Sequence, residues 1–227
     1  MAAVKDIYHF LDERAPFDSQ LGFDNAGFLV GRGDQPVTRV LVALDITEEV
    51  AREATAVGAE LIVSHHPVIW EGAKSVTDET LLGRKLLALI TGNIAAICAH
   101  TNLDAARSGV NDALAAALGL TETALLKTYG VYADGTPYGI ERVGTLPGGP
   151  VFLEEFAVAV KEKLGSNGVR YVDGGRPVRS TPWMDMTHGV ERLFGNRQNI
   201  GGRCMRSAPL CVRSRRSPES GRRADRA

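Results

Sequence analysis

The chain has 227 residues, of which 26 are basic, 27 are acidic and 44% are hydrophobic. This length and composition suit a protein that buries a hydrophobic core, which excludes a small disulfide-stapled scaffold and an intrinsically disordered chain. The apolar runs are much shorter than the roughly 20 residues that cross a bilayer, and the acidic start of the chain does not resemble a secretory signal. We therefore expect a cytoplasmic protein of one or two domains with no membrane association.

Cysteine content and net charge limit the kinds of site that the chain can carry. Cys98, Cys204 and Cys211 are odd in number and form no CxxC pair, which argues against a disulfide framework and against a thiolate zinc site. A metal would therefore need histidine and carboxylate ligands. The net charge of -1 gives no general attraction to nucleic acid, so we expect no specific nucleic-acid partner.

Strand and helix signals alternate along the first part of the chain. A turn at 24–27 feeds an expected edge strand at 28–31, and aliphatic runs predict further strands at 39–44, 60–64 and 94–99. Capping residues and apolar spacing predict helices at 47–57, 80–90 and 110–118. Helices of about a dozen residues between strands indicate crossover connections. We therefore expect an α/β domain over residues 1–126, with a mixed, largely parallel sheet covered by helices.

A second, shorter set of signals follows over residues 127–179. Strands are predicted at 139–146 and 169–172, on either side of a helix at 152–164 whose apolar residues recur at helical spacing. This pattern predicts a second α/β half that is incomplete.

The end of the chain differs from both halves. Residues 181–227 contain ten arginines, no lysine and four acidic residues, which gives them a net charge of +6 and leaves -7 for the rest of the chain. Their apolar residues follow neither a helical nor a strand period. We therefore expect a disordered, solvated tail over residues 180–227.

Polar residues that could bind a metal follow three of the predicted strands. Asp45 follows the first, His65 and His66 follow the second, and His100 and Asp104 follow the third. The carboxyl ends of the strands form the ligand-binding edge of an open α/β sheet. We therefore expect these residues to converge, and histidine with aspartate is the ligand set of a metal site without thiolates.

The adjacent histidines allow two interpretations. Neighbouring side chains on a strand point to opposite faces, so His65 and His66 cannot easily hold one ion together. If the strand ends there, each histidine could bind a different ion, with Asp104 as a bridge, and paired ions roughly 3.5 to 4 Å apart suit hydrolysis by an activated water. Alternatively, one histidine is buried and hydrogen-bonded while the other is solvated.

Three further polar residues are expected near the site. Asp24 and Asn25 belong either to the rim of the site or to a turn that feeds the edge strand. Asp45 either accepts a hydrogen bond that orients a histidine ligand or begins the turn into the next helix.

Five motifs in order resemble a known family, that of the Ngg-interacting-factor-like dinuclear metal-centre proteins, whose members are often named GTP cyclohydrolase type 2 homologues. The motifs are FDNAGFLVG at 23–31, ALDITEEV at 43–50, GAELIVSHHPVIW at 58–70, AHTNLDAARSGVNDALAAALGL at 99–120 and GIERVGTLP at 139–147. The resemblance runs from the first helix to about Arg179, in a short form without an extra middle domain.

The resemblance implies a metal site and an assembly. His65, His66 and Asp104 match the family's metal ligands, and His100 lies next to the site. It further implies two divalent ions, such as zinc, iron or manganese, a homohexamer, and a metal-dependent hydrolase that acts on a small molecule or nucleotide. The alternative is a non-catalytic metal-binding scaffold or interaction protein.

The sequence departs from the family pattern after Arg179. The family supplies two more ligands from a C-terminal motif, a histidine and a glutamate four residues after it, and this motif is missing. His188 and Glu191 are three residues apart and lack the flanking pattern, so we do not assign them as ligands. An arginine-rich, aperiodic ending after a good match is typical of a frameshifted reading of a GC-rich gene, and we expect such a chain to bind two metals poorly.

Overall fold

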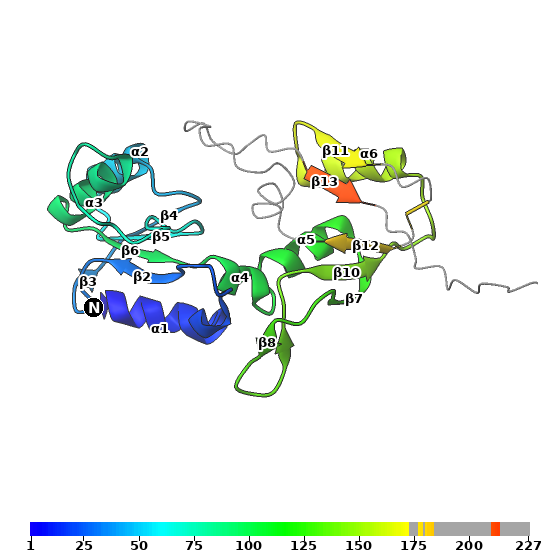
Figure 1. The fold of residues 1–227 in the computed structure, drawn as a ribbon, viewed down its shortest axis with the longest axis horizontal. Coiled ribbons are helices and arrows are strands. Elements are labelled where there is room, and N and C mark those ends of the chain that lie inside the picture. Colours follow the sequence, from blue (N-terminus) through cyan, green and yellow to red (C-terminus); the bar gives the residue numbers. More distant parts are fainter. Residues whose placement is uncertain (173–176, 179, 184–209, 214–227) are drawn as a thin grey trace, which may run out of the picture.

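The computed structural model describes residues 1–172, 177–178, 180–183 and 210–213. It is a mixed α/β structure in which two groups of elements follow one another along the long axis, with α4 and α5 between them (Figure 1). Within the described residues, no helix combines the length and the apolar character that crossing a bilayer requires.

The first half is built on a four-stranded sheet. Its order is β2 (Gly27–Val30), β6 (Ala95–Cys98), β5 (Leu61–Ser64) and β4 (Val40–Ala43). Strands β4, β5 and β6 are parallel, and β2 runs antiparallel to β6 along the opposite edge. The predicted fold class, a mixed and largely parallel sheet covered by helices, is therefore confirmed.

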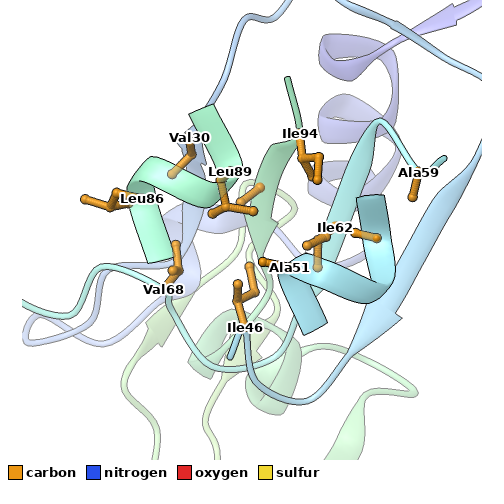
Figure 2. Packing of buried hydrophobic residues seen from close by; sticks show 11 residues of the cluster. Val30, Ile46, Ala51, Ala59, Ile62, Val68, Leu86, Leu89 and Ile94 are labelled. Carbon is orange, nitrogen blue, oxygen red and sulfur yellow. The ribbon is translucent and has the colours of Figure 1, made fainter. Parts of the chain in front are cut away.

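Helices cover both faces of this sheet. α2 (Glu48–Val57) and α3 (Leu81–Thr91) pack on one face, where Ile62 contacts a cluster that includes Leu86 and Leu89 (Figure 2). α1 (Val4–Arg14), the short strands β1 (Ala2–Ala3) and β3 (Pro36–Val37) and the 3-10 turn η1 (Phe17–Ser19) belong to the other side, where Leu61 and Ile97 are buried. Successive strand residues thus face opposite cores, as the pleat requires.

The register of the parallel strands places their carboxyl ends side by side. Ala43 pairs with Ser64, and Ser64 pairs with Cys98. The loops that follow β4, β5 and β6 therefore leave the sheet at one edge. All of the polar residues that follow these strands in the sequence are brought to that edge.

Two helices then lead the chain toward the second half. α4 (Thr101–Ala105) begins directly after His100, and α5 (Val110–Leu118) follows it. The bounds of α5 match the prediction, whereas α4 was not predicted because five residues are too few to show a helical period.

The second half contains a three-stranded antiparallel sheet, in the order β12 (Ser180–Trp183), β10 (Arg142–Thr145) and β7 (Thr121–Leu125). The small hairpin of β8 (Gly130–Val131) and β9 (Pro137–Tyr138) lies beside it, and α6 (Leu153–Leu164) precedes β11 (Val169–Val172). Leu118 and Leu120 pack with Phe156 and Val160 of α6 in a separate apolar core. Strand β7 pairs with β10 across the domain boundary that we predicted after residue 126.

Part of the predicted tail is paired with the second half. Ser180–Trp183 forms β12 against β10, and β13 (Leu210–Arg213) runs parallel to β11. At these two strands the structure differs from the predicted disordered tail, because backbone pairing does not require the apolar periodicity that we looked for. The rest of the tail, with His188, Glu191 and Cys204, lies outside the described residues.

Candidate metal centre

Three histidines converge at the carboxyl edge of the first sheet. His65 and His66 lie in the turn after β5, and His100 lies between β6 and α4. Their ring centroids are 5.0 to 5.6 Å apart, and one ring nitrogen from each lies within 4.8 Å of the others. Because β5 ends at Ser64, the opposite orientation of neighbouring strand side chains does not apply to His65 and His66.

Each of the three rings uses its Nδ1 atom for a hydrogen bond to an oxygen. His65 Nδ1 lies 3.0 Å from the carbonyl oxygen of Ala99, which can only accept. His66 and His100 place Nδ1 2.7 Å from the carboxylates of Asp45 and Asp24 respectively. Nδ1 is therefore the donor in each neutral ring, and Nε2 carries the lone pair that a metal ion needs.

Asp24 is a buried carboxylate that orients His100. Its side chain has no exposed area, and it also accepts hydrogen bonds from the backbone and hydroxyl groups of Thr101. Burial on its own raises the pKa of Asp24, but the hydrogen bonds from His100 and Thr101 outweigh it and lower the pKa to about 2. Asp24 is therefore an ionised acceptor at neutral pH, and the predicted rim residue lies inside the site.

Asp45 plays the corresponding part for His66 from a more open position. About half of its side chain is exposed, and the hydrogen bond from His66 is the main cause of its lowered pKa, to which the charge of Lys85 contributes. Of the two interpretations offered by the sequence, the structure favours an acceptor that orients a histidine over a simple turn residue.

Asp104 lies one helical turn after His100 and is fully buried. Its amide donates to the carbonyl of His100 at 3.1 Å, and its Oδ1 lies 3.8 Å from Nε2 of His65. The side-chain amide of Asn111 donates to the Asp104 carbonyl at 3.3 Å. The first turn of α4 thus brings a carboxylate to the Nε2 side of His65, at the position from which it could share a metal ion.

The neighbouring polar residues hold the loops of the site. Asn25 donates to the carbonyl of Ile69 at 2.7 Å and so fixes the segment that follows the histidine pair. Asn102 accepts from the amide of His100 and donates to the carbonyl of Ala15. Both side chains therefore hold backbone segments beside the histidines.

Two residues near the site were not singled out by the sequence. Trp70 places its ring centroid 5.5 Å from that of His100, and its signals were its place three residues after the His-His-Pro turn and at the end of the motif at 58–70. Thr101 joins Asp24 to the start of α4, and nothing in the sequence pointed to that contact between residues 77 positions apart.

The donor set fits a divalent transition-metal ion that binds nitrogen and oxygen ligands. It consists of imidazole nitrogens and a carboxylate, which suit zinc, iron and manganese. Cys98 is close by, but burial raises the pKa of its thiol, and its sulfur donates to the carbonyl of His65. It therefore stays a thiol and supports the histidine backbone, so this cluster could bind a metal through nitrogen and oxygen alone.

Comparisons with known proteins agree with the fold and with the motifs. The profile of the Duf34/NIF3 (NGG1p interacting factor 3) family matches residues 2–183, which includes β12. A protein named GTP cyclohydrolase 1 type 2 homolog from Clostridium perfringens is 38% identical over 172 residues, which are 74% of this chain and 63% of that protein. One of the same name from Streptomyces coelicolor is 37% identical over 164 residues, or 72% and 57%. The chain thus spans less than two thirds of these relatives.

Solved structures show the same architecture. A Staphylococcus aureus hypothetical protein, 27% identical, superposes with a TM-score of 0.71 over 84% of this chain and 75% of its own. A Bacillus cereus protein related to NIF3, 22% identical, supports the fold alone, with a TM-score of 0.73 over 81% and 76%. With the match over residues 2–183, the chain belongs to the Duf34/NIF3 family.

Proposed function

We propose that the chain is a divalent-metal-binding protein whose centre, formed by His65, His66, His100 and Asp104, serves a hydrolytic reaction. The observation that carries the proposal is the shared arrangement of the three histidines. Each donates through Nδ1 to an oxygen, which leaves Nε2 as its candidate ligand atom, and one ring nitrogen of each lies within 4.8 Å of the others. Metal-binding histidines almost always donate their other nitrogen in this way.

The chain's own residues prepare the donors before an ion arrives. Asp24 and Asp45 hold His100 and His66 in the tautomer that leaves Nε2 able to bind, and the Ala99 carbonyl does the same for His65. The buried Asp104 supplies negative charge beside these rings. A divalent ion held there supplies Lewis acidity and lowers the pKa of a water molecule, which suits hydrolysis.

The spacing of the donors bears on the number of ions. Metal–nitrogen distances of about 2.0 to 2.1 Å allow two ligands of one ion to lie at most roughly 4.2 Å apart. The histidine nitrogens lie within 4.8 Å of one another, so these residues and Asp104 could hold one ion or two. We propose the dinuclear form, with the ligands His65, His66 and Asp104 that the sequence predicted and His100 as a further ligand.

Other parts of the proposal rest on the family. Relatives carry the name GTP cyclohydrolase 1 type 2 homolog, which supports a nucleotide or similar small molecule as the substrate. A homohexamer and a cytoplasmic location complete the proposal.

Metal content and hydrolysis, measured on the same samples, test the proposal. The full chain, loaded with zinc, iron or manganese and dialysed, is assayed for bound metal and for turnover of nucleotides and phosphodiesters. We expect metal-dependent turnover that His65→Ala abolishes. His9→Ala is the matched control, because His9 is an exposed histidine of α1, and it should change neither quantity. Metal binding without turnover would support the scaffold instead, and equal metal loss in both variants would contradict the site.

A further inference from the structure

A cleft of about 370 Å³ opens beside the histidine cluster. Its walls come from the segment after the histidine pair and from the start of α3, and they comprise Val68, Trp70, Glu71, Leu81, Leu82 and Lys85. This volume lies at the lower end of the range for small-molecule sites. The cleft therefore suits a ligand with one ring system and not a dinucleotide or a peptide.

Trp70 connects the cleft to the metal centre. Its ring is a wall of the cleft, and its centroid lies 5.5 Å from that of His100, with the two planes at 76°. Phe23 also contacts the tryptophan, with ring centroids 6.5 Å apart. Trp70 is 45% exposed and Phe23 is 52% exposed, so both rings present aromatic surface to solvent beside His100.

The remaining walls are apolar with a single pair of opposite charges. Val68, Leu81 and Leu82 supply apolar surface, while Lys85 and Glu71 supply one positive and one negative group. Lys85 is half-buried on α3, and its charge acts on Asp45, the partner of His66. An aromatic and apolar lining with a few polar groups is the usual form of a small-molecule site.

We propose that this cleft binds a planar heterocycle that carries an anionic group, with the ring stacked on Trp70 and the anion paired with Lys85. Glu71 then accepts a hydrogen bond from an N–H group of the ring. The proposal deepens the proposed function, and rests on it, in that it names the substrate class of the neighbouring metal centre. Stacking on an aromatic side chain is a strong and sequence-tolerant contribution to base recognition, so the ring is the main source of affinity.

The test measures binding without turnover, so that it remains separate from hydrolysis. Three probes are compared by equilibrium dialysis against the full chain treated with a chelator: GTP, guanosine and tripolyphosphate. We expect GTP to bind more tightly than guanosine, and tripolyphosphate to bind more weakly than either. Because no metal is present, GTP binding is expected even if the metal proposal is wrong. If the chain binds metal but does not bind GTP, only the proposal for the cleft is overturned.

Two substitutions and their controls assign the contacts. Trp70→Ala should weaken GTP and guanosine binding by roughly 10- to 100-fold, and Trp70→Phe should restore part of it. Lys85→Gln should weaken GTP binding at least about 3-fold and leave guanosine unchanged. Phe10→Ala and Lys161→Gln replace an aromatic residue and a lysine that are exposed elsewhere, and both should bind as the parent does.

Three outcomes would overturn the proposal. GTP and tripolyphosphate binding equally would show that the ring is not recognised. Equal effects of Lys85→Gln and Lys161→Gln would show a diffuse charge effect. A change of oligomeric mass in Trp70→Ala, measured by light scattering, without any change in GTP binding would show that the aromatic surface contacts another copy of the chain. Far-ultraviolet circular dichroism of each variant establishes that the fold is kept.

Discussion

The two halves of the chain differ in where they bury polar groups. At the carboxyl edge of the first sheet, five polar residues are buried side by side: Ser64, His100, Thr101, Asn102 and Asp104. From Thr121 onward, Arg142 alone is both polar and buried among the residues whose burial the structure describes, and it pairs with Asp112 at 2.5 Å. The core of the second half is an apolar cluster that α5 and α6 form together with Leu146, which follows β10.

This difference separates the half that carries the candidate metal site from the half that does not. Burying polar groups costs free energy unless they are hydrogen-bonded, and most of the buried polar residues of the first half lie at the carboxyl edge of its sheet. The apolar core of the second half requires no such compensation. Substitutions in the two halves should therefore have separable effects on metal binding and on unfolding.

The largest expected effect is on stability and lies in the second half. Phe156 is buried in the α5–α6 core, and Phe156→Ala should lower the free energy of unfolding by about 3 to 5 kcal/mol. Phe152→Ala is the control, because Phe152 is 66% exposed at the start of the same helix. Urea denaturation followed by circular dichroism measures both. Metal content of the folded fraction should not change, and a parallel loss of metal would show that the two halves act as one unit.

The next effect is on metal binding in the first half. Asp104→Ala removes the buried carboxylate beside His65, and we expect metal affinity to fall by more than about 100-fold, beyond the range for residues that only orient a ligand. Competition with a chromophoric chelator measures the affinity. Asp34→Ala, which removes an exposed aspartate, should leave it unchanged, and Asp104→Asn shows whether the charge or the shape matters.

Asp45→Ala should have a smaller effect on metal affinity than Asp104→Ala. Asp45 accepts the Nδ1 proton of His66 but is half-exposed, so water can replace it in part. We expect metal affinity to fall by roughly 10-fold, at the lower end of the range for such partners. If Asp45→Ala and Asp104→Ala lose equal amounts of metal after dialysis, the roles assigned to the two carboxylates are wrong.

The strands of the first sheet could be predicted because their signals are local. Aliphatic runs flanked by threonine caps and glycine stops indicate β4, β5, β6 and the helices between them, since buried parallel strands are apolar on both faces. β7 gives no such signal, because its five residues are mostly exposed and do not alternate. β12 depends on pairing with β10, a tertiary contact that sequence periodicity does not reveal.

The site was predictable to the same degree. The rule that ligands bind at the carboxyl ends of strands is sufficient to bring the three histidines and Asp104 to one place from their positions in the sequence. It could not show that Asp24, 76 residues before His100, accepts the Nδ1 proton of that histidine. The packing of the folded chain determines such hydrogen-bond partners, and no local sequence pattern reveals them.

The smallest expected effect is on the pH dependence of stability. It is compared for one surface carboxylate from each half. Glu60, at the start of β5, accepts hydrogen bonds from the backbone of Arg39 and from Thr38, which lower its pKa from 4.5 to about 2. Asp134, in the β8–β9 hairpin, has its pKa lowered from 3.8 to about 2 by the backbone of Thr136 and by Arg107. Each carboxylate has a lower pKa in the folded chain than in the unfolded chain. It therefore stabilises the fold fully at pH values above its unfolded-state pKa, and this contribution is lost as the pH falls from there through about 2.

Glu60→Gln should therefore lower the free energy of unfolding at pH 6. The difference in this free energy between the variant and the parent chain, here called the gap, should be smaller at pH 3. Asp134→Asn should show a smaller gap with the same trend, because the hairpin joins only two short strands, whereas Glu60 ties the strand β5 to the turn before β4. Urea denaturation at the two pH values measures both variants. A gap for Glu60→Gln that stays constant with pH would mean that its hydrogen bonds, and not its charge, provide the stabilisation.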